Sequence, residues 1–211
     1  MMQRKRQGIW AAILLAAFAL FTAAVCRVDV RPIGPHGSAV GFATLNGFVH
    51  GLTGVHMDLY ALTDWLSLAP LGLVLGFALL GLAQWIKRRS LLRVDRSILA
   101  LGGFYIVVMA AYLLFEVLAV NYRPVLIGGE LEASYPSSTT MLVLCVMITA
   151  MMQLRSRIKS HIFRRSVLFA MLVFAAFMVA GRFVSGVHWL TDIVGGMLLS
   201  AGLVLLYAFF A

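Results

Sequence analysis

The chain has 211 residues, of which 62% are hydrophobic and 12% are charged, with a formal net charge of +9. Soluble domains usually carry about 25% charged residues, so this chain has too few polar side chains to cover a water-soluble core. The composition excludes an ordinary soluble enzyme and predicts a membrane protein. At about 20 residues for each crossing, the length permits six or seven spans. We expect a single domain over residues 1–211.

Six apolar runs are candidates for membrane spans, and they follow one another in chain order: Ile9–Cys26, Trp65–Ile86, Ile98–Val120, Thr139–Leu154, Ser166–Phe183 and Trp189–Phe210. The fourth run is short, and its helix is expected to extend inward past Gln153. These runs predict an all-α fold, a polytopic bundle of six transmembrane helices. The first run has an alternative interpretation as a cleaved signal peptide, although it is long for that role.

The positive charges gather in three clusters at the ends of apolar runs: Arg4, Lys5 and Arg6; Lys87, Arg88, Arg89, Arg93 and Arg96; Arg155, Arg157, Lys159, Arg164 and Arg165. A cytoplasmic N-terminus places all three clusters inside, as the bias of cytoplasmic loops towards Lys and Arg requires. This pattern favours a multi-pass protein of a bacterial-type plasma membrane over a nucleic-acid-binding protein. It gives no signal for the oligomeric state.

An outer segment between the first two runs, Val28–His56, is rich in glycine and contains apolar residues at helical spacing: Phe42, Leu45, Phe48, Val49 and Leu52. The spacing predicts a short helix, which either lies in the membrane interface or packs over the top of the bundle. The histidines of this segment have no carboxylate or cysteine partner at ligand spacing, so no metal site is predicted and no cofactor is expected.

Two outer connections hold the polar residues that carry chemistry. Arg123 ends the third run, Ser137 precedes the fourth, Arg182 ends the fifth and His188 opens the sixth. Four helix ends therefore meet at one membrane face, and helix N-termini and arginines both favour an anion. The run Ser137-Ser138-Thr139 adds hydroxyl donors at a helix start. Together these groups predict a phosphate-binding site.

His188 and Asp192 are four residues apart, which predicts one face of the sixth helix. A carboxylate that accepts from one ring nitrogen fixes the tautomer and leaves the other nitrogen free as a base or nucleophile. An ionisable residue inside an apolar run is costly and usually functional. The alternative is structural, with Asp192 capping a turn and Ser or Thr capping the fourth helix.

These stretches resemble the type 2 phosphatidic acid phosphatase superfamily of lipid phosphate phosphatases. That family reads Lys-x6-Arg-Pro, Pro-Ser-Gly-His and Ser-Arg-x5-His-x3-Asp, and this chain has Arg123-Pro124, Pro136-Ser137 and Arg182-x5-His188-x3-Asp192. The resemblance implies a membrane lipid substrate and no metal. It implies that His188 forms a phosphohistidine and that Asp192 orients it. The phosphoryl oxygens would be held by Arg123, Arg182 and residues 137–139.

The chain departs from the family pattern at four positions. Glu116 stands in place of the lysine, Gly181 in place of the serine and Ser138 in place of the glycine. Thr139 replaces the histidine that protonates the leaving group. General acid help is typically worth ~10²–10⁴ in rate, and its loss matters least when the leaving group is acidic, as in a pyrophosphate. Other candidate proton donors are Glu116, Glu130 and Glu132.

We therefore expect a membrane phosphatase that hydrolyses a lipid phosphate or polyprenyl pyrophosphate at the extracytoplasmic face. A phosphotransferase with an alcohol acceptor is one alternative. A non-catalytic descendant that binds or moves a phospholipid is another, and the two altered motifs favour it. The intact His188–Asp192 pair favours the enzyme.

Overall fold

Six helical spans build the molecule, and the computed structural model describes them within residues 2–211. Each is long and apolar enough to cross a membrane: α1 (Met2–Val25), α3 with α4 (Met57–Leu66 and Leu68–Arg88), α5 (Arg96–Leu118), α6 (Ser138–Arg157), α7 (His161–Val184) and α8 (Leu190–Phe210). Residues 2–211 contain no β-strand. The predicted all-α, six-span membrane fold is confirmed, including the extension of α6 past Gln153.

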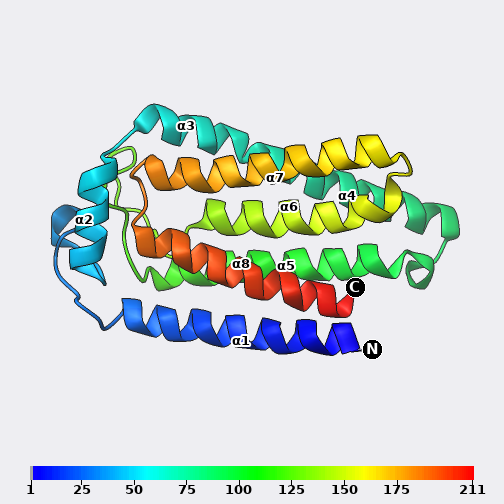
Figure 1. Cartoon of the computed structure of the whole chain (residues 1–211), viewed down its shortest axis with the longest axis horizontal. Coiled ribbons are helices and arrows are strands. Elements are labelled where there is room, and N and C mark those ends of the chain that lie inside the picture. The colour runs from blue at the N-terminus through cyan, green and yellow to red at the C-terminus, as the bar shows by residue number, and fades with distance from the viewer. Residues whose placement is uncertain (1) are drawn as a thin grey trace.

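The spans lie side by side along the long axis of the molecule, and both termini lie at the same end (Figure 1). The connections that carry the basic clusters lie at this end too. Here Asp95 accepts a hydrogen bond from Arg88 Nη1 at 2.9 Å, and Arg157 Nη2 lies 3.8 Å from the same carboxylate. Ion pairs therefore join the ends of α4, α5 and α6 at the face that the sequence predicts to be cytoplasmic.

The second span begins eight residues before the predicted start at Trp65, because α3 precedes α4 with a break at Ser67. The hydropathy pattern hides α3, since Asp58 and Asp64 lower the apolar content of this stretch. Pro70 accounts for the break, because it has no N–H to donate to the carbonyl four residues earlier. As a result α3 is a separate segment that packs against α7 near the end of the bundle opposite the termini.

The outer segment contains the predicted short helix, α2 (Ala43–Thr53), which lies across the ends of the spans (Figure 1). Its polar side faces the bundle, where the fully buried Asn46 donates from its side-chain amide to Thr191 Oγ1 at 2.9 Å. Its apolar side is exposed, with Phe48 66% and Leu52 71% accessible. The predicted short helix is present, it lies across the ends of the spans, and its apolar residues point away from the bundle.

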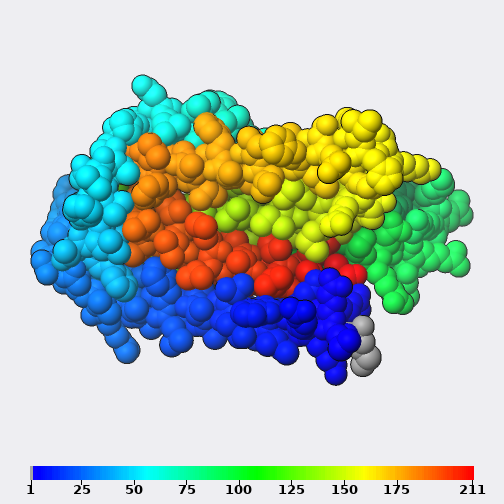
Figure 2. Space-filling model, viewed as in Figure 1, coloured from blue at the N-terminus to red at the C-terminus, as the bar shows by residue number. Residues whose placement is uncertain are grey.

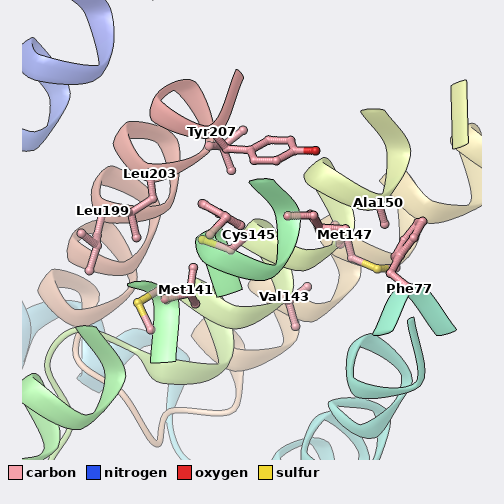
Figure 3. Close-up of a cluster of buried hydrophobic side chains, with 14 of the residues drawn as sticks. Phe77, Met141, Val143, Cys145, Met147, Ala150, Leu199, Leu203 and Tyr207 are labelled. Carbon is pink, nitrogen blue, oxygen red and sulfur yellow. The ribbon is translucent and has the colours of Figure 1, made fainter. Parts of the chain in front are cut away.

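The core lies around α6 and α8, where half of each span is buried inside the protein. Side chains of α6 pack against those of α8 and α4 (Figure 3): Met141, Val143, Cys145, Met147 and Ala150 against Leu199, Leu203, Tyr207 and Phe77. In the space-filling view α1 lies directly against α8 (Figure 2). Gly202 allows this approach, because a Cβ there would meet Leu15 Cδ2 at 2.8 Å. The buried α6 and α8 thus support the polar residues at the end of the bundle opposite the termini.

Candidate active site

His188 lies in the turn between α7 and α8, two residues before α8 begins. The turn passes close to the outer segment, because Gly186 has a φ of +68° and a Cβ there would lie 1.8 Å from the carbonyl oxygen of Gly54. The expectation that His188 and Asp192 share one helical face is wrong. Asp192 accepts from the backbone N–H of Trp189 at 2.8 Å, and this cap starts the helix after the histidine.

The imidazole is joined to the carboxylate through a third side chain, Ser134. His188 Nδ1 lies 3.0 Å from Ser134 Oγ, and this hydroxyl donates to Asp192 Oδ2. The direct distance from Nδ1 to Oδ2 is 3.8 Å, so the expected direct hydrogen bond is replaced by a bridge. Because the single hydroxyl hydrogen goes to Asp192, Nδ1 must be the donor to Ser134. The other oxygen, Oδ1, accepts from Asn121 Nδ2 at 3.4 Å. This arrangement leaves a lone pair on Nε2.

Burial lowers the pKa of His188 from 6.5 to about 4. Removal from water disfavours the charged imidazolium and is the main cause; the Asp192 contact opposes the shift, and the nearby Arg123 guanidinium adds to it. Nε2 lies 3.5 Å from Arg123 Nη1. The ring is therefore neutral near pH 7, with its nucleophilic nitrogen directed at a cation.

The protonation state of His188 is open to direct measurement. ¹⁵N-histidine NMR of the protein in detergent, with His188 assigned by its absence in His188→Ala, should show a neutral Nδ1–H tautomer from pH 8 to about pH 5. Because the folded pKa is below the unfolded value, the folded state should lose stability as the pH falls from 6.5 towards 4. Protonation near pH 6.5, or an Nε2–H tautomer, would contradict the bridged arrangement.

Arg182, in the last turn of α7, is the second cation of the site. Its side chain is only 2% exposed. Nη2 donates to Asp64 Oδ1 at 2.7 Å and to Thr139 Oγ1 at 2.9 Å, and Cζ lies 4.7 Å from the centre of the Tyr60 ring. Nε and Nη1 are buried and have no partner within residues 2–211. A buried donor without a partner typically costs ~1–3 kcal/mol, so these groups fit an anion that binds here.

Arg123 also lies near Tyr60, with its Cζ 5.8 Å from the ring centre. Glu132 Oε2 lies 3.0 Å from Arg123 Nε, but off the N–H direction, so the contact is an ion pair without an aligned hydrogen bond. Tyr60 therefore contacts both guanidinium groups. Arg123 has His188 at its Nη1, while Arg182 has its own carboxylate and hydroxyl partners.

The loop between α5 and α6 brings Ser134 and Arg123 to the histidine. Its two arms pair through backbone hydrogen bonds from Arg123 N to Glu132 O at 3.0 Å and from Ser134 N to Asn121 O at 2.8 Å. The indole N–H of Trp189 donates to a carbonyl of the same loop at 2.7 Å. These bonds fix the loop against the start of α8 and hold the bridging hydroxyl in place.

The predicted phosphate-binding hydroxyls have separate environments. Ser137 is fully buried and caps α6, accepting from Thr140 N at 3.4 Å, while its own N–H donates to the carbonyl of Asp192 at 3.0 Å. The structural alternative, in which a serine caps the fourth helix, therefore holds for Ser137. Ser138 lines a small cavity together with Ser134 and Glu116.

Thr139 is the one residue of the predicted hydroxyl group that the described contacts join to an arginine. Three members of the site were not predicted from the sequence: Ser134, Tyr60 and Asp64. Ser134 had a weak signal, since it lies three residues before the Pro-Ser motif residue Ser137. Tyr60 and Asp64 had none, because they precede Arg182 by more than a hundred positions and lie in a helix that hydropathy did not reveal.

Six apolar spans with a buried neutral imidazole and two arginines at one end define a helical membrane protein with a buried cationic cluster. The model of the PAP2 superfamily matches residues 72–210, and the chain belongs to this superfamily. The matched part contains Arg123, Arg182, His188 and Asp192, so the family resemblance inferred from the sequence is confirmed.

A solved structure shows the same fold. It is described as the first transmembrane PAP2 type phosphatidylglycerolphosphate phosphatase from Bacillus subtilis, and it aligns over 94% of both chains with a TM-score of 0.62. The identity is 18%, so this likeness concerns the fold alone. No curated protein matches the chain. The chain is thus a membrane protein with the fold of the PAP2 phosphatases.

Proposed function

We propose that the protein is a membrane phosphatase that hydrolyses a lipid phosphate or polyprenyl pyrophosphate through a phosphohistidine at the extracytoplasmic face. The observation that carries this proposal is the state of His188. Its Nδ1 is tied through Ser134 to Asp192, its burial keeps it neutral, and its Nε2 faces Arg123. A nucleophilic histidine needs all three features.

In the first step Nε2 attacks phosphorus and the bond to the leaving oxygen breaks. Negative charge on the phosphoryl oxygens is stabilised by Arg123 and by the two unpartnered donors of Arg182. The positive charge that forms on the ring is stabilised by the Ser134–Asp192 bridge. In the second step water attacks phosphorus and the bond to Nε2 breaks, releasing phosphate. The two guanidiniums supply the cationic charge, so we expect no requirement for a divalent ion.

An apolar cavity supports a lipid as the substrate. It begins at Thr139, which contacts Arg182, and continues between α4, α5 and α6 to Val146. Val74 and Tyr105 line both this cavity and a second apolar one that reaches Trp85 near the inner end of α4. A lipid chain in these cavities would place its phosphate at the outer end, beside the arginines.

Phosphate release from matched lipids tests the function and the substrate class together. Because Thr139 stands where a proton donor is expected, kcat/KM should be higher for a polyprenyl pyrophosphate than for the matching monophosphate. Activity should persist in EDTA. Thr139→His should help the monophosphate more, since its alkoxide leaving group is far more basic, by at most ~10²–10⁴.

Each result of that assay has a clear consequence. A wild-type preference for the monophosphate would indicate another acid, and Glu116→Gln and Glu132→Gln would identify it. An absolute need for a divalent ion would contradict the phosphohistidine step. Binding of both lipids without turnover of either would favour the lipid-binding alternative.

The orientation of the site is tested by cysteine labelling in a Cys26→Ser background, because Cys26 is exposed and would itself react. Cysteines at Pro35 and Gly129 should react with an impermeant maleimide in intact cells, while one at Ser90 should react only after permeabilisation. The reason is the bias of basic clusters towards the cytoplasm. Labelling of the Ser90 position from outside would place the site on the cytoplasmic face.

A further inference from the structure

Asp64 contacts the phosphate-binding arginine, although it lies before the part of the chain that the family model matches. Its side chain is 59% exposed, whereas that of Arg182 is 2% exposed. The approach of α3 to α7 depends on Gly181, where the family pattern has serine. A Cβ at Gly181 would lie 2.7 Å from Thr63 Cγ2, so a larger residue there would push the two helices apart.

The hydrogen bonds of Arg182 leave two of its nitrogens free to donate to phosphate while Asp64 stays bound. Asp64 and Thr139 both bond to Nη2, whereas Nε and Nη1 are unpartnered within the described chain. A phosphoryl group can therefore bind to the free donors while the carboxylate keeps its own bond. Asp64 need not leave the site when substrate enters.

The two ends of the site differ in what they offer to the reaction. His188 lies at the Arg123 end, while Asp64 and Thr139 lie at the Arg182 end. A phosphoryl group held between the two guanidiniums then has His188 and Glu132 on the Arg123 side and Asp64 on the Arg182 side. In an in-line displacement the leaving group, and later the attacking water, occupy the side opposite the nucleophile. This is the side of Asp64.

We propose that Asp64 is the general base that activates water for hydrolysis of the phosphohistidine, an inference that rests on the proposed function. The water oxygen bonds to phosphorus as its proton passes to the carboxylate. The bond from phosphorus to Nε2 of His188 breaks, and its electron pair returns to the ring. Phosphate leaves, and the half-exposed Asp64 releases its proton to solvent.

This role agrees with the replacement of the expected proton donor by Thr139. In the proposed role Asp64 takes a proton from the attacking water, while Thr139 stands where the donor of a proton to the leaving group is expected. Formation of the phosphohistidine then has no help from a proton donor, whereas its hydrolysis is helped by a proton acceptor. Such an enzyme suits a pyrophosphate, whose leaving phosphate group needs no proton.

Rapid-quench kinetics with a polyprenyl pyrophosphate labelled in its terminal phosphate separates the two steps. Asp64→Asn should form acid-labile phosphoenzyme at nearly the wild-type rate but hydrolyse it ~10²–10⁴ times more slowly, the usual range for a positioned proton acceptor. Phosphoenzyme should accumulate in this variant. Asp64→Glu should recover most of the hydrolysis rate. Asp58→Asn, an exposed aspartate on the same helix, is the matched control and should behave as wild type.

Three results would overturn the proposal while leaving the phosphohistidine intact. The first is hydrolysis in Asp64→Asn at the rate of Asp58→Asn. The second is an equal loss of both steps, which would make Asp64 a positioning partner of Arg182. The third is a lower KM of Asp64→Asn with an unchanged hydrolysis rate, which would mean that Asp64 only competes with phosphate for Arg182. Turnover in which neither the wild type nor Asp64→Asn forms any phosphoenzyme would instead remove the proposed function and the base role with it.

Discussion

His188→Ala is expected to reduce phosphate release to background while the protein stays folded. The neutral ring nitrogen Nε2 lies beside Arg123 with a free lone pair, and alanine offers no substitute for it. Phosphate release from the polyprenyl pyrophosphate measures the effect, and size-exclusion chromatography and thermal unfolding verify the fold. His161→Ala, an exposed histidine at the opposite end of the bundle, is the matched control.

The same variant separates the enzyme from the lipid-binding alternative. If turnover depends on the nucleophile, His188→Ala should still bind the lipid through Arg123 and Arg182, since both guanidiniums remain. Near-normal turnover in His188→Ala would exclude the nucleophile assignment. Absence of turnover in both the wild type and the variant, with equal binding, would favour a non-catalytic protein.

Asp192→Asn is expected to lower kcat by ~10⁴, the size of effect seen when a triad carboxylate is replaced by its amide. An amide nitrogen facing Ser134 would prevent the hydroxyl from donating to position 192. The hydroxyl hydrogen would then turn to His188 Nδ1 and favour the Nε2–H tautomer, which has no lone pair for phosphorus. The ¹⁵N spectrum of the variant should show this change of tautomer directly.

Ser134→Ala, which removes the bridging hydroxyl, is the control for the result with Asp192→Asn. Ser134→Ala removes the hydroxyl but keeps the carboxylate 3.8 Å from Nδ1, so it should lower kcat less than Asp192→Asn. Asp192 also caps α8 and is fully buried, and losing such bonds typically costs ~1–3 kcal/mol of stability. Both variants must therefore be compared as folded protein. A larger effect of Ser134→Ala would mean that the serine, not the aspartate, determines the tautomer.

The helices and the family were predictable because their signals are local in sequence. Each span is a run of apolar residues that any window along the chain detects. The third family motif lies within eleven residues, so its spacing is visible without a structure. The prediction failed at α3, where two aspartates interrupt the apolar pattern although the residues still form a helix. Hydropathy detects runs of apolar residues, so a helix that carries two aspartates gives a weaker signal.

The contacts inside the site were not predictable in the same way. The sequence by itself determined the membrane class, the six spans, and the identity of His188, Asp192 and the two arginines as the polar residues at one end. Only the tertiary structure decided that Ser134 stands between the histidine and the aspartate and that Asp64 reaches Arg182. The bridge depends on the path of an irregular loop, which has no periodicity. The Asp64 contact depends on a close approach of two helices at Gly181, far apart in the chain, where a single missing Cβ sets the distance.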